Sequence, residues 1–347
     1  MKALRPNSLK ISALILWVFY TAFWVLPANA AAPAPAVPKG FRLVESDFGV
    51  WIYKKDYQGG TPDYVQVIDL SAGAKLIAMH GDIQDPGTGK GVYGGNDARF
   101  KVQSLEKYWK DLSQRQERAF CVTNGQFFRM GETPTRLPFP LKVDGEFLTD
   151  GYGKNEFVNR KLILEIWDDK VDIHALSAGS IYASSAPTII AGLMEEANKR
   201  SQHYVGRTFV GVDDWNHDRK YETLMIFNTR SARQVDAAGI LREFGADKVM
   251  MLDGGGSTQL ICRDGDFVPS DRPIPQAIGV VAGIEPPEPV YIPNLQKPAQ
   301  ASLIPVVNVT SKVDAINLND AALVPVMMLP VVGVIVLVLS RFRRQYR

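Results

Sequence analysis

Val249-Met-Met-Leu-Asp253-Gly-Gly-Gly-Ser-Thr-Gln-Leu260 is the stretch on which the interpretation of this sequence depends. Its first four residues are apolar, which predicts a short buried strand. Asp253 ends that strand, and the three glycines after it permit positive φ angles and a close approach of another group to the backbone. Successive amides in such a turn can form an anion-binding concavity. The alternative is a tight turn whose glycines serve only strand packing.

Two familiar motifs do not fit this stretch. A P-loop needs a lysine before its hydroxyl residue, and the stretch has none. The Gly-x-Ser-x-Gly elbow of serine hydrolases would need a glycine at position 259, which is Gln259. A carboxylate beside free amides and two hydroxyls instead suits a substrate that carries a phosphate and also needs acid–base or nucleophilic help.

Working outward from this stretch, hairpin signals outnumber the spacings of β-α-β units. Asp144-Gly145, Asp168-Asp169 and Asp264-Gly265 each separate two short apolar runs. Helical spacing is confined to residues 102–116 and to a segment from Ser231 to about Phe244, where Ser231 begins a capping-box pattern. The sequence therefore predicts one large α+β domain with a mixed, mostly antiparallel sheet and packed helices.

The flanks of the domain predict export and attachment to a membrane. Residues 1–30 resemble a signal peptide, with a basic start, an apolar middle and small residues at its end. The remaining segments follow in this order: an Ala/Pro linker at 31–40, the domain at 41–285, a Pro-rich stalk at 286–320, a transmembrane segment at 321–340 and a basic cytoplasmic tail at 341–347. The expected topology is single-pass, with the domain on the periplasmic or cell-surface side. An uncleaved N-terminal anchor and a processed C-terminal sorting signal are the alternatives.

Charge and cysteine content narrow the class of partners. Seven of the 39 Lys and Arg residues lie in the two termini, so the middle of the chain holds 32 basic against 37 acidic residues. This mildly acidic balance gives no basic face for nucleic acid. Cys121 and Cys262 match no zinc or redox spacing. A disulfide and two free thiols both remain open for this pair.

Four motifs in this order resemble the phosphodiester glycosidase family. They are Asn124-Gly-Gln-Phe-Phe128, Gly206-Arg-Thr208, Leu252-Asp-Gly-Gly-Gly-Ser-Thr258 and Arg272-Pro273, and the resemblance extends over about residues 64–284. It implies a hydrolase that cleaves between a sugar's anomeric carbon and a phosphate that is esterified elsewhere. The animal member has cysteine-rich modules that two cysteines cannot supply, so its mannose-phosphate substrate is not carried over. A phosphorylated envelope glycan or glycolipid, with an N-acetylglucosamine-type sugar as one candidate, is the expected substrate and partner.

The chemistry assigns roles to the residues of these motifs. A phosphate monoester is a weakly basic leaving group, so binding its charge matters more than donating a proton to it. A carboxylate can stabilise or attack an oxocarbenium-like centre, or activate water beside it, and Asp253 is the predicted catalytic residue. Backbone amides, hydroxyls and guanidinium groups would bind phosphate or sugar oxygens. The predicted substrate-binding residues are Asn124, Arg207, Thr208, Gly254, Gly255, Gly256, Ser257, Thr258 and Arg272.

Several assignments keep alternatives. Arg207 or Arg272 could instead form a surface ion pair or cap backbone carbonyls. Asn124 could simply begin a turn. A second catalytic carboxylate has candidates by residue type alone, and these are Glu132, Glu165 and Asp213.

Two alternative functions remain open, and one of them would depend on a metal ion. Residues 213–218 contain metal-ligand types without a known ligand spacing, so we expect a hairpin loop there, no metal and no cofactor. A non-catalytic phosphoglycan-binding surface protein would keep the glycines and arginines. A metal-dependent phosphodiesterase would cut the P–O bond instead of the C–O bond.

Overall fold

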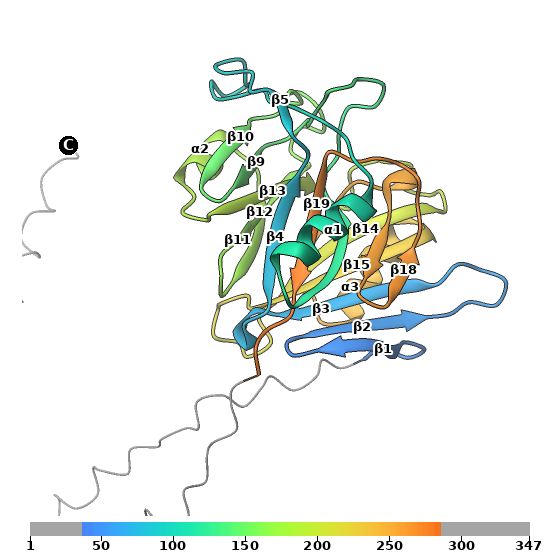
Figure 1. The fold of residues 1–347 in the computed structure, drawn as a ribbon. Coiled ribbons are helices and arrows are strands. Elements are labelled where there is room, and N and C mark those ends of the chain that lie inside the picture. Colours follow the sequence, from blue (N-terminus) through green and yellow to red (C-terminus); the bar gives the residue numbers. More distant parts are fainter. Residues whose placement is uncertain (1–36, 286–347) are drawn as a thin grey trace, which may run out of the picture. The chain divides into compact units, whose positions relative to one another are not determined.

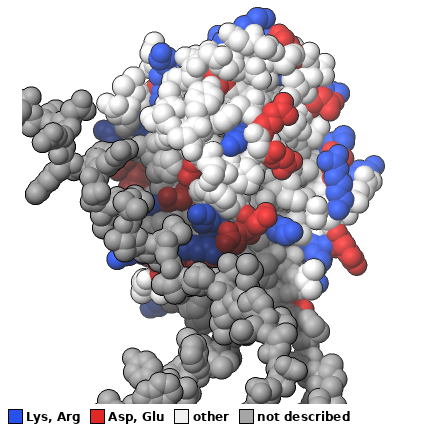
Figure 2. Space-filling view, turned by 90° about the vertical axis from the view of Figure 1, so that its left-hand side faces the viewer, with Lys and Arg blue, Asp and Glu red and all other residues white. Residues whose placement is uncertain are grey.

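The computed structural model of the protein describes residues 37–285. The predicted signal peptide (1–30), stalk (286–320), transmembrane segment (321–340) and cytoplasmic tail (341–347) lie outside this range. Among the described residues, no helix combines the length and the apolar character that crossing a membrane would require. Basic and acidic side chains are interspersed on the face of the domain shown in Figure 2.

The largest sheet has eleven strands. Its order is β1-β2-β3-β15-β14-β16-β13-β11-β12, and β9 pairs with both β13 and β10. These strands are β1 (Arg42–Asp47), β2 (Val50–Lys55), β3 (Asp63–Asp69), β9 (Leu141–Val143), β10 (Glu146–Thr149), β11 (Lys161–Ile166), β12 (Val171–Ala175), β13 (Thr188–Leu193), β14 (Val205–Asp213), β15 (Thr223–Ala232) and β16 (Lys248–Met251).

A second sheet of five strands packs against the first. Its order is β18 (Gly265–Val268), β17 (Leu260–Cys262), β7 (Ala119–Asn124), β19 (Gln276–Val281) and β4 (Lys75–His80). Three short strands, β5 (Ile83–Asp85), β6 (Arg99–Phe100) and β8 (Thr135–Arg136), form a small third sheet. All strand pairs in sheets of the described part are antiparallel.

The predicted α+β class is therefore wrong, because the fold is mostly β. Residues 37–285 contain nineteen strands but only three short α-helices, which are α1 (Leu105–Arg115), α2 (Ala178–Ala183) and α3 (Gln234–Glu243). The prediction failed because a large core lies between two sheets instead of between one sheet and packed helices. Side chains of β15 in one sheet and of β19 in the other share this core, an arrangement that depends on distant strand pairing.

Alternating side chains of the large sheet reach two separate cores. In β15, Leu224 and Ile226 pack toward the five-stranded sheet, where they meet residues such as Ile278. Met225 and Phe227 point to the opposite face, which α3 covers. The period of two along a strand explains this division. The domain is thus a two-sheet sandwich with a helix on each outer face, because α1 covers the five-stranded sheet (Figure 1).

The helices α1 and α3 occur where the sequence predicted them, but α3 begins later than expected. Residues 102–116 contain α1, whose N-terminal amide of Lys107 donates to the Ser104 hydroxyl at 3.3 Å. The predicted helix start at Ser231 is wrong, because β15 continues to Ala232 and α3 begins at Gln234. Pairing with β14, where Ala232 lies opposite Val205, keeps the chain extended there.

Cys121 and Cys262 form a disulfide, which resolves the two possibilities left by the sequence. The two residues lie opposite each other on the neighbouring strands β7 and β17. β7 ends at Asn124, and β17 begins directly after the glycine-rich stretch. The disulfide therefore links the strand that follows this stretch to the strand that ends at Asn124.

Candidate active site

A cavity of about 580 Å³ opens beside the end of β16. Asp253 is the only carboxylate in its lining, whereas Lys199, Arg200, Arg207 and Arg272 supply four positive charges. The remaining lining residues are Phe127, Met130, Phe157, Asn198, Val205, Met251, Leu252, Gly254, Gly255 and Gly256. This excess of cations favours an anionic ligand.

The position of Asp253 is fixed by its backbone. Its amide donates to the Gly125 carbonyl at 3.1 Å, and its carbonyl accepts from Asn124 Nδ2 at 2.8 Å. One carboxylate oxygen, Oδ1, accepts from the Gly254 amide at 2.9 Å. The side chain is therefore held in place while remaining partly exposed to the cavity.

Burial dominates the acidity of Asp253. It raises the pKa of the carboxyl to about 6, although nearby Ser257, the Gly254 amide and the charges of Lys199 and Arg272 all act to lower it. The Ser257 hydroxyl makes no hydrogen bond within the described chain. A carboxyl with a pKa near neutrality can serve as base, acid or nucleophile, and such perturbed groups concentrate at functional sites.

The three glycines contribute in different ways. The Gly254 amide is occupied by Asp253, but we find no acceptor among residues 37–285 for the amides of Gly255 and Gly256. Gly255 has a φ of 63°, which a side chain would make unfavourable. A Cβ on Gly254 would lie 2.6 Å from the Gly206 carbonyl oxygen, so close strand packing also requires a glycine there. Two donor amides thus remain available beside the carboxylate.

Arg272 and Lys199 both line the cavity, and neither has an acidic partner in a salt bridge among the described residues. The Arg272 guanidinium lies against Gly256, whose added Cβ would be 2.8 Å from its central carbon. Its Nη1 contacts Met130 Sδ at 3.3 Å. Lys199 Nζ lies 5.0 Å from the ring centre of Phe127. Neither residue forms a salt bridge within the described range, so both charges are available to a ligand.

Arg207 is buried and caps backbone carbonyls. Its guanidinium donates to the carbonyls of Lys199 (2.9 Å), Arg200 (2.7 Å), His203 (3.2 Å) and Ala232 (3.1 Å). Burial lowers the pKa of this guanidinium. Capping of backbone carbonyls is the alternative to substrate binding that the sequence left open for Arg207. These hydrogen bonds hold the loop that places Lys199 and Arg200 at the cavity, while the positive charge of Arg207 stays beside it.

Asn124 and Thr208 lie beneath the cavity instead of lining it. Asn124 Oδ1 accepts from Thr208 Oγ1 at 2.8 Å and from the Gln259 amide at 3.2 Å. Thr208 Oγ1 in turn accepts from Asn228 Nδ2 at 3.3 Å. Both residues are at most 1% exposed. Their geometry suits positioning of Asp253 through this buried network.

Ser257 and Thr258 are also buried. Neither belongs to the cavity lining, and neither hydroxyl has a hydrogen-bond partner among residues 37–285. The three candidates for a second carboxylate lie elsewhere as well. Glu132 pairs with arginines and Glu165 with His174, while Asp213 ends β14.

Sequence reasoning missed Lys199, Arg200 and the buried amides of Asn228 and Gln259. Lys199 and Arg200 lie in a polar connection between strands, and only the contacts of Arg207 bring that connection to the cavity. Asn228 offered a weak signal, because an amide within the apolar run of β15 needs a buried partner.

Comparison with known proteins identifies the family of the domain. Residues 117–281 match the family model of phosphodiester glycosidase, which confirms the resemblance seen in the sequence. No curated protein matches the chain.

Two solved structures are similar at low sequence identity. A hypothetical protein from Synechocystis is 13% identical with a TM-score of 0.44, and the match covers 71% of this chain and 64% of that protein. The zebrafish N-acetylglucosamine-1-phosphodiester alpha-N-acetylglucosaminidase catalytic domain, auto-inhibited by its pro-peptide, is 15% identical with a TM-score of 0.45, and the match covers 74% of this chain and 86% of that domain. This chain therefore spans less than two thirds of the Synechocystis protein.

Proposed function

Because residues 117–281 carry a phosphodiester glycosidase domain, which is a hydrolase domain, we propose that this protein hydrolyses a sugar-1-phosphate diester in the cavity around Asp253. The observation that carries the proposal is the charge arrangement of this cavity. One carboxylate with a raised pKa shares the cavity lining with four cationic residues, of which Lys199 and Arg272 act on its charge, and with two free backbone amides. Hydrolysis of such a diester needs cationic and amide donors to bind the leaving phosphate, and it needs a carboxylate next to the reacting carbon.

The phosphate would bind at the cationic side of the cavity. Among residues 37–285, Arg272 forms no salt bridge and lies against Gly256, the amides of Gly255 and Gly256 have no acceptor, and Lys199 adds a further charge to the lining. Donors fixed before the substrate arrives stabilise charge that develops in the transition state. As the C–O bond breaks, its electron pair stays on the phosphate oxygen, and the cations stabilise the resulting monoester.

Asp253 would act at the anomeric carbon. Its carboxylate can stabilise the positive charge that develops there, attack that carbon, or take a proton from the attacking water. In each case the water oxygen ends on the sugar. The phosphate leaves as a monoester whose charge lowers its need for a proton donor.

Substrate class and location are further parts of the proposal. We infer an envelope glycan or glycolipid as the substrate, with an N-acetylglucosamine-type sugar as one candidate. The signal-like residues 1–30 and the apolar residues 321–340 support export and membrane attachment. The Cys121–Cys262 disulfide supports an oxidising compartment.

The test offers a panel of sugar-1-phosphodiesters to the purified protein and identifies both products. With ¹⁸O-labelled water, hydrolysis at the anomeric carbon places the label in the sugar. Label in the phosphate would identify a phosphodiesterase and overturn the proposal. Binding without any product would identify a phosphoglycan-binding protein instead.

A further inference from the structure

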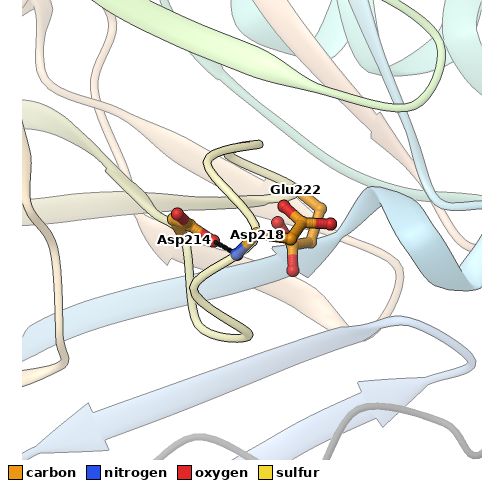
Figure 3. Close-up of side chains that lie close together, drawn as sticks. All are labelled: Asp214, Asp218 and Glu222. Atoms are coloured by element: carbon orange, nitrogen blue, oxygen red, sulfur yellow. Dashed lines mark hydrogen bonds between the residues drawn. The ribbon is translucent and has the colours of Figure 1, made fainter.

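A second group of ionisable side chains lies at the other end of the β14–β15 hairpin. Asp214, Asp218 and Glu222 each place a carboxylate oxygen within 4.8 Å of the others (Figure 3). The strand β14 connects the two regions, because Arg207 near its start lies beside the cavity and Asp213 at its end directly precedes Asp214. Six residues of extended strand span about 20 Å. The cluster is therefore separate from the candidate active site.

Glu222 is the unusual member of this cluster. Its side chain is buried, with the residue only 2% exposed, yet neither carboxylate oxygen has a hydrogen-bond partner in the part of the chain that the structure describes. Removing a charged carboxylate from water without compensation costs several kcal/mol. One of these oxygens lies within 4.8 Å of carboxylate oxygens of Asp214 and Asp218, which increases that cost.

No salt bridge within residues 37–285 pairs the cluster with a basic side chain, although the charge of Lys220 acts on Asp218 and Glu222 from a greater distance. Asp213, Asp214, Asp218 and Glu222 take part in none of the salt bridges found there. The nearest lysine in sequence, Lys220, directs its Nζ to Asp169 at 2.8 Å. Burial, followed by the charges of Asp218, Asp214 and Asp69, raises the pKa of Glu222 to about 7. Four acidic groups thus share one region of the described domain in which no basic side chain forms a salt bridge with them.

The hairpin loop holds these groups in place by its own hydrogen bonds. Asp214 Oδ1 accepts from the Asp218 amide at 3.0 Å, and Asp214 Oδ2 accepts from the Arg219 amide at 2.8 Å. The Asp218 side chain is solvent-exposed, whereas Glu222 closes the inner side. A cation bound between them would contact protein on one side and water on the other.

We propose that Asp214, Asp218 and Glu222 form a binding site for a calcium ion. All three ligands are hard carboxylate oxygens, which calcium prefers, and a loop open to water accommodates its six to eight ligands more readily than the strict octahedron of magnesium. The ion would connect the hairpin loop to the buried start of β15. It would stabilise the fold and take no part in the reaction.

The test measures calcium binding and thermal unfolding of the chelator-treated protein. Calorimetric titration with CaCl₂ should show saturable binding with a dissociation constant of about 1 mM or below, as in extracellular modules, and calcium should raise Tm. Glu222→Gln should lose both effects, and without calcium it should unfold at a higher temperature than the wild type because it removes the buried charge. Asp218→Asn, at an exposed position, should weaken binding at least about tenfold.

Asp168→Asn is the matched control, because Asp168 is an exposed acid outside the cluster that forms no salt bridge in the described part, whereas Asp169 holds Lys220 away from the cluster. It should bind calcium as the wild type does. Absence of binding to the wild type, unchanged binding to Glu222→Gln, or an equal response to MgCl₂ would each overturn the proposal.

Discussion

Asn124 Nδ2 donates a hydrogen bond of 2.8 Å to the backbone carbonyl of Asp253. This bond joins the end of β7, in the five-stranded sheet, to the end of β16, in the eleven-stranded sheet. Asp253 therefore stands where the two sheets of the sandwich meet at one edge. The sheets bring the carboxylate, the glycine amides and the cations together from segments far apart in the sequence.

Replacing Asn124 by alanine should both destabilise the protein and reduce turnover. The change leaves the Thr208 hydroxyl, the Gln259 amide and the Asp253 carbonyl without their shared partner. Buried polar groups left unpaired cost about 1–3 kcal/mol each, so we expect urea denaturation to show a loss of at least about 2 kcal/mol. The exposed Asn155→Ala should change neither property. Wild-type stability of Asn124→Ala would contradict the positioning role.

Replacing Arg207 by lysine should destabilise the loop that supports the cavity. An ammonium group cannot reproduce the planar, multiply donating geometry that reaches four carbonyls. We expect a lower Tm and faster proteolysis within residues 198–203. If stability and proteolysis stay as in the wild type and only substrate binding weakens, Arg207 clamps the substrate instead of the loop.

Replacing Arg272 by alanine should weaken substrate binding without affecting the fold. Arg272 contacts Met130 and Gly256 but no described carboxylate. A charge-assisted hydrogen bond contributes about 1.5–3 kcal/mol, which corresponds to a loss of about 10- to 150-fold in kcat/KM. Tm should remain within about 2 °C of the wild type. The exposed Arg115→Ala serves as control, and an equal effect of both substitutions on kcat/KM would exclude a specific contact.

The raised pKa of Asp253 predicts two pH dependences. If the carboxylate is the active form, kcat/KM should rise with pH and level off above about 6. The folded state binds this proton more tightly than the unfolded state, so the cost of the charged carboxyl is absent below about pH 4 and complete above about pH 6. Asp253→Asn should therefore gain stability relative to the wild type at pH 8 but not at pH 4. If Asp253→Asn were instead less stable than the wild type at pH 8, the charge of Asp253 would stabilise the fold.

Local patterns predicted the parts of the fold that depend on neighbours in sequence. The spacing of Leu105, Trp109 and Leu112 along one face indicated α1; Leu105 and Leu112 are buried, and Trp109 is half-buried. The apolar run before Asp253 indicated β16. The arrangement of the strands could not be predicted, because it depends on distant pairs such as β15 with β3 and on strands buried on both faces.

The candidate site likewise combines features that depend on neighbours in sequence with features that depend on distant contacts. Asp253 and its glycines were evident because turn chemistry is local. The role of Arg207 was not, because its four carbonyl partners lie in a loop and a strand end whose courses the sandwich determines. The sequence also could not predict that the Glu222 carboxylate is buried without a hydrogen-bond partner, because its neighbours in sequence do not indicate this.

The most direct test is the rate at which Asp253→Asn releases sugar from a sugar-1-phosphodiester that the wild type cleaves. Asparagine preserves the size of the side chain and an acceptor for the Gly254 amide, so fold and substrate binding should remain. We predict a loss of turnover of about 10²–10⁴-fold, whereas Asp266→Asn, at an exposed position on the five-stranded sheet, should retain full activity. Turnover by Asp253→Asn close to that of the wild type would contradict the assignment of Asp253 as the catalytic carboxylate.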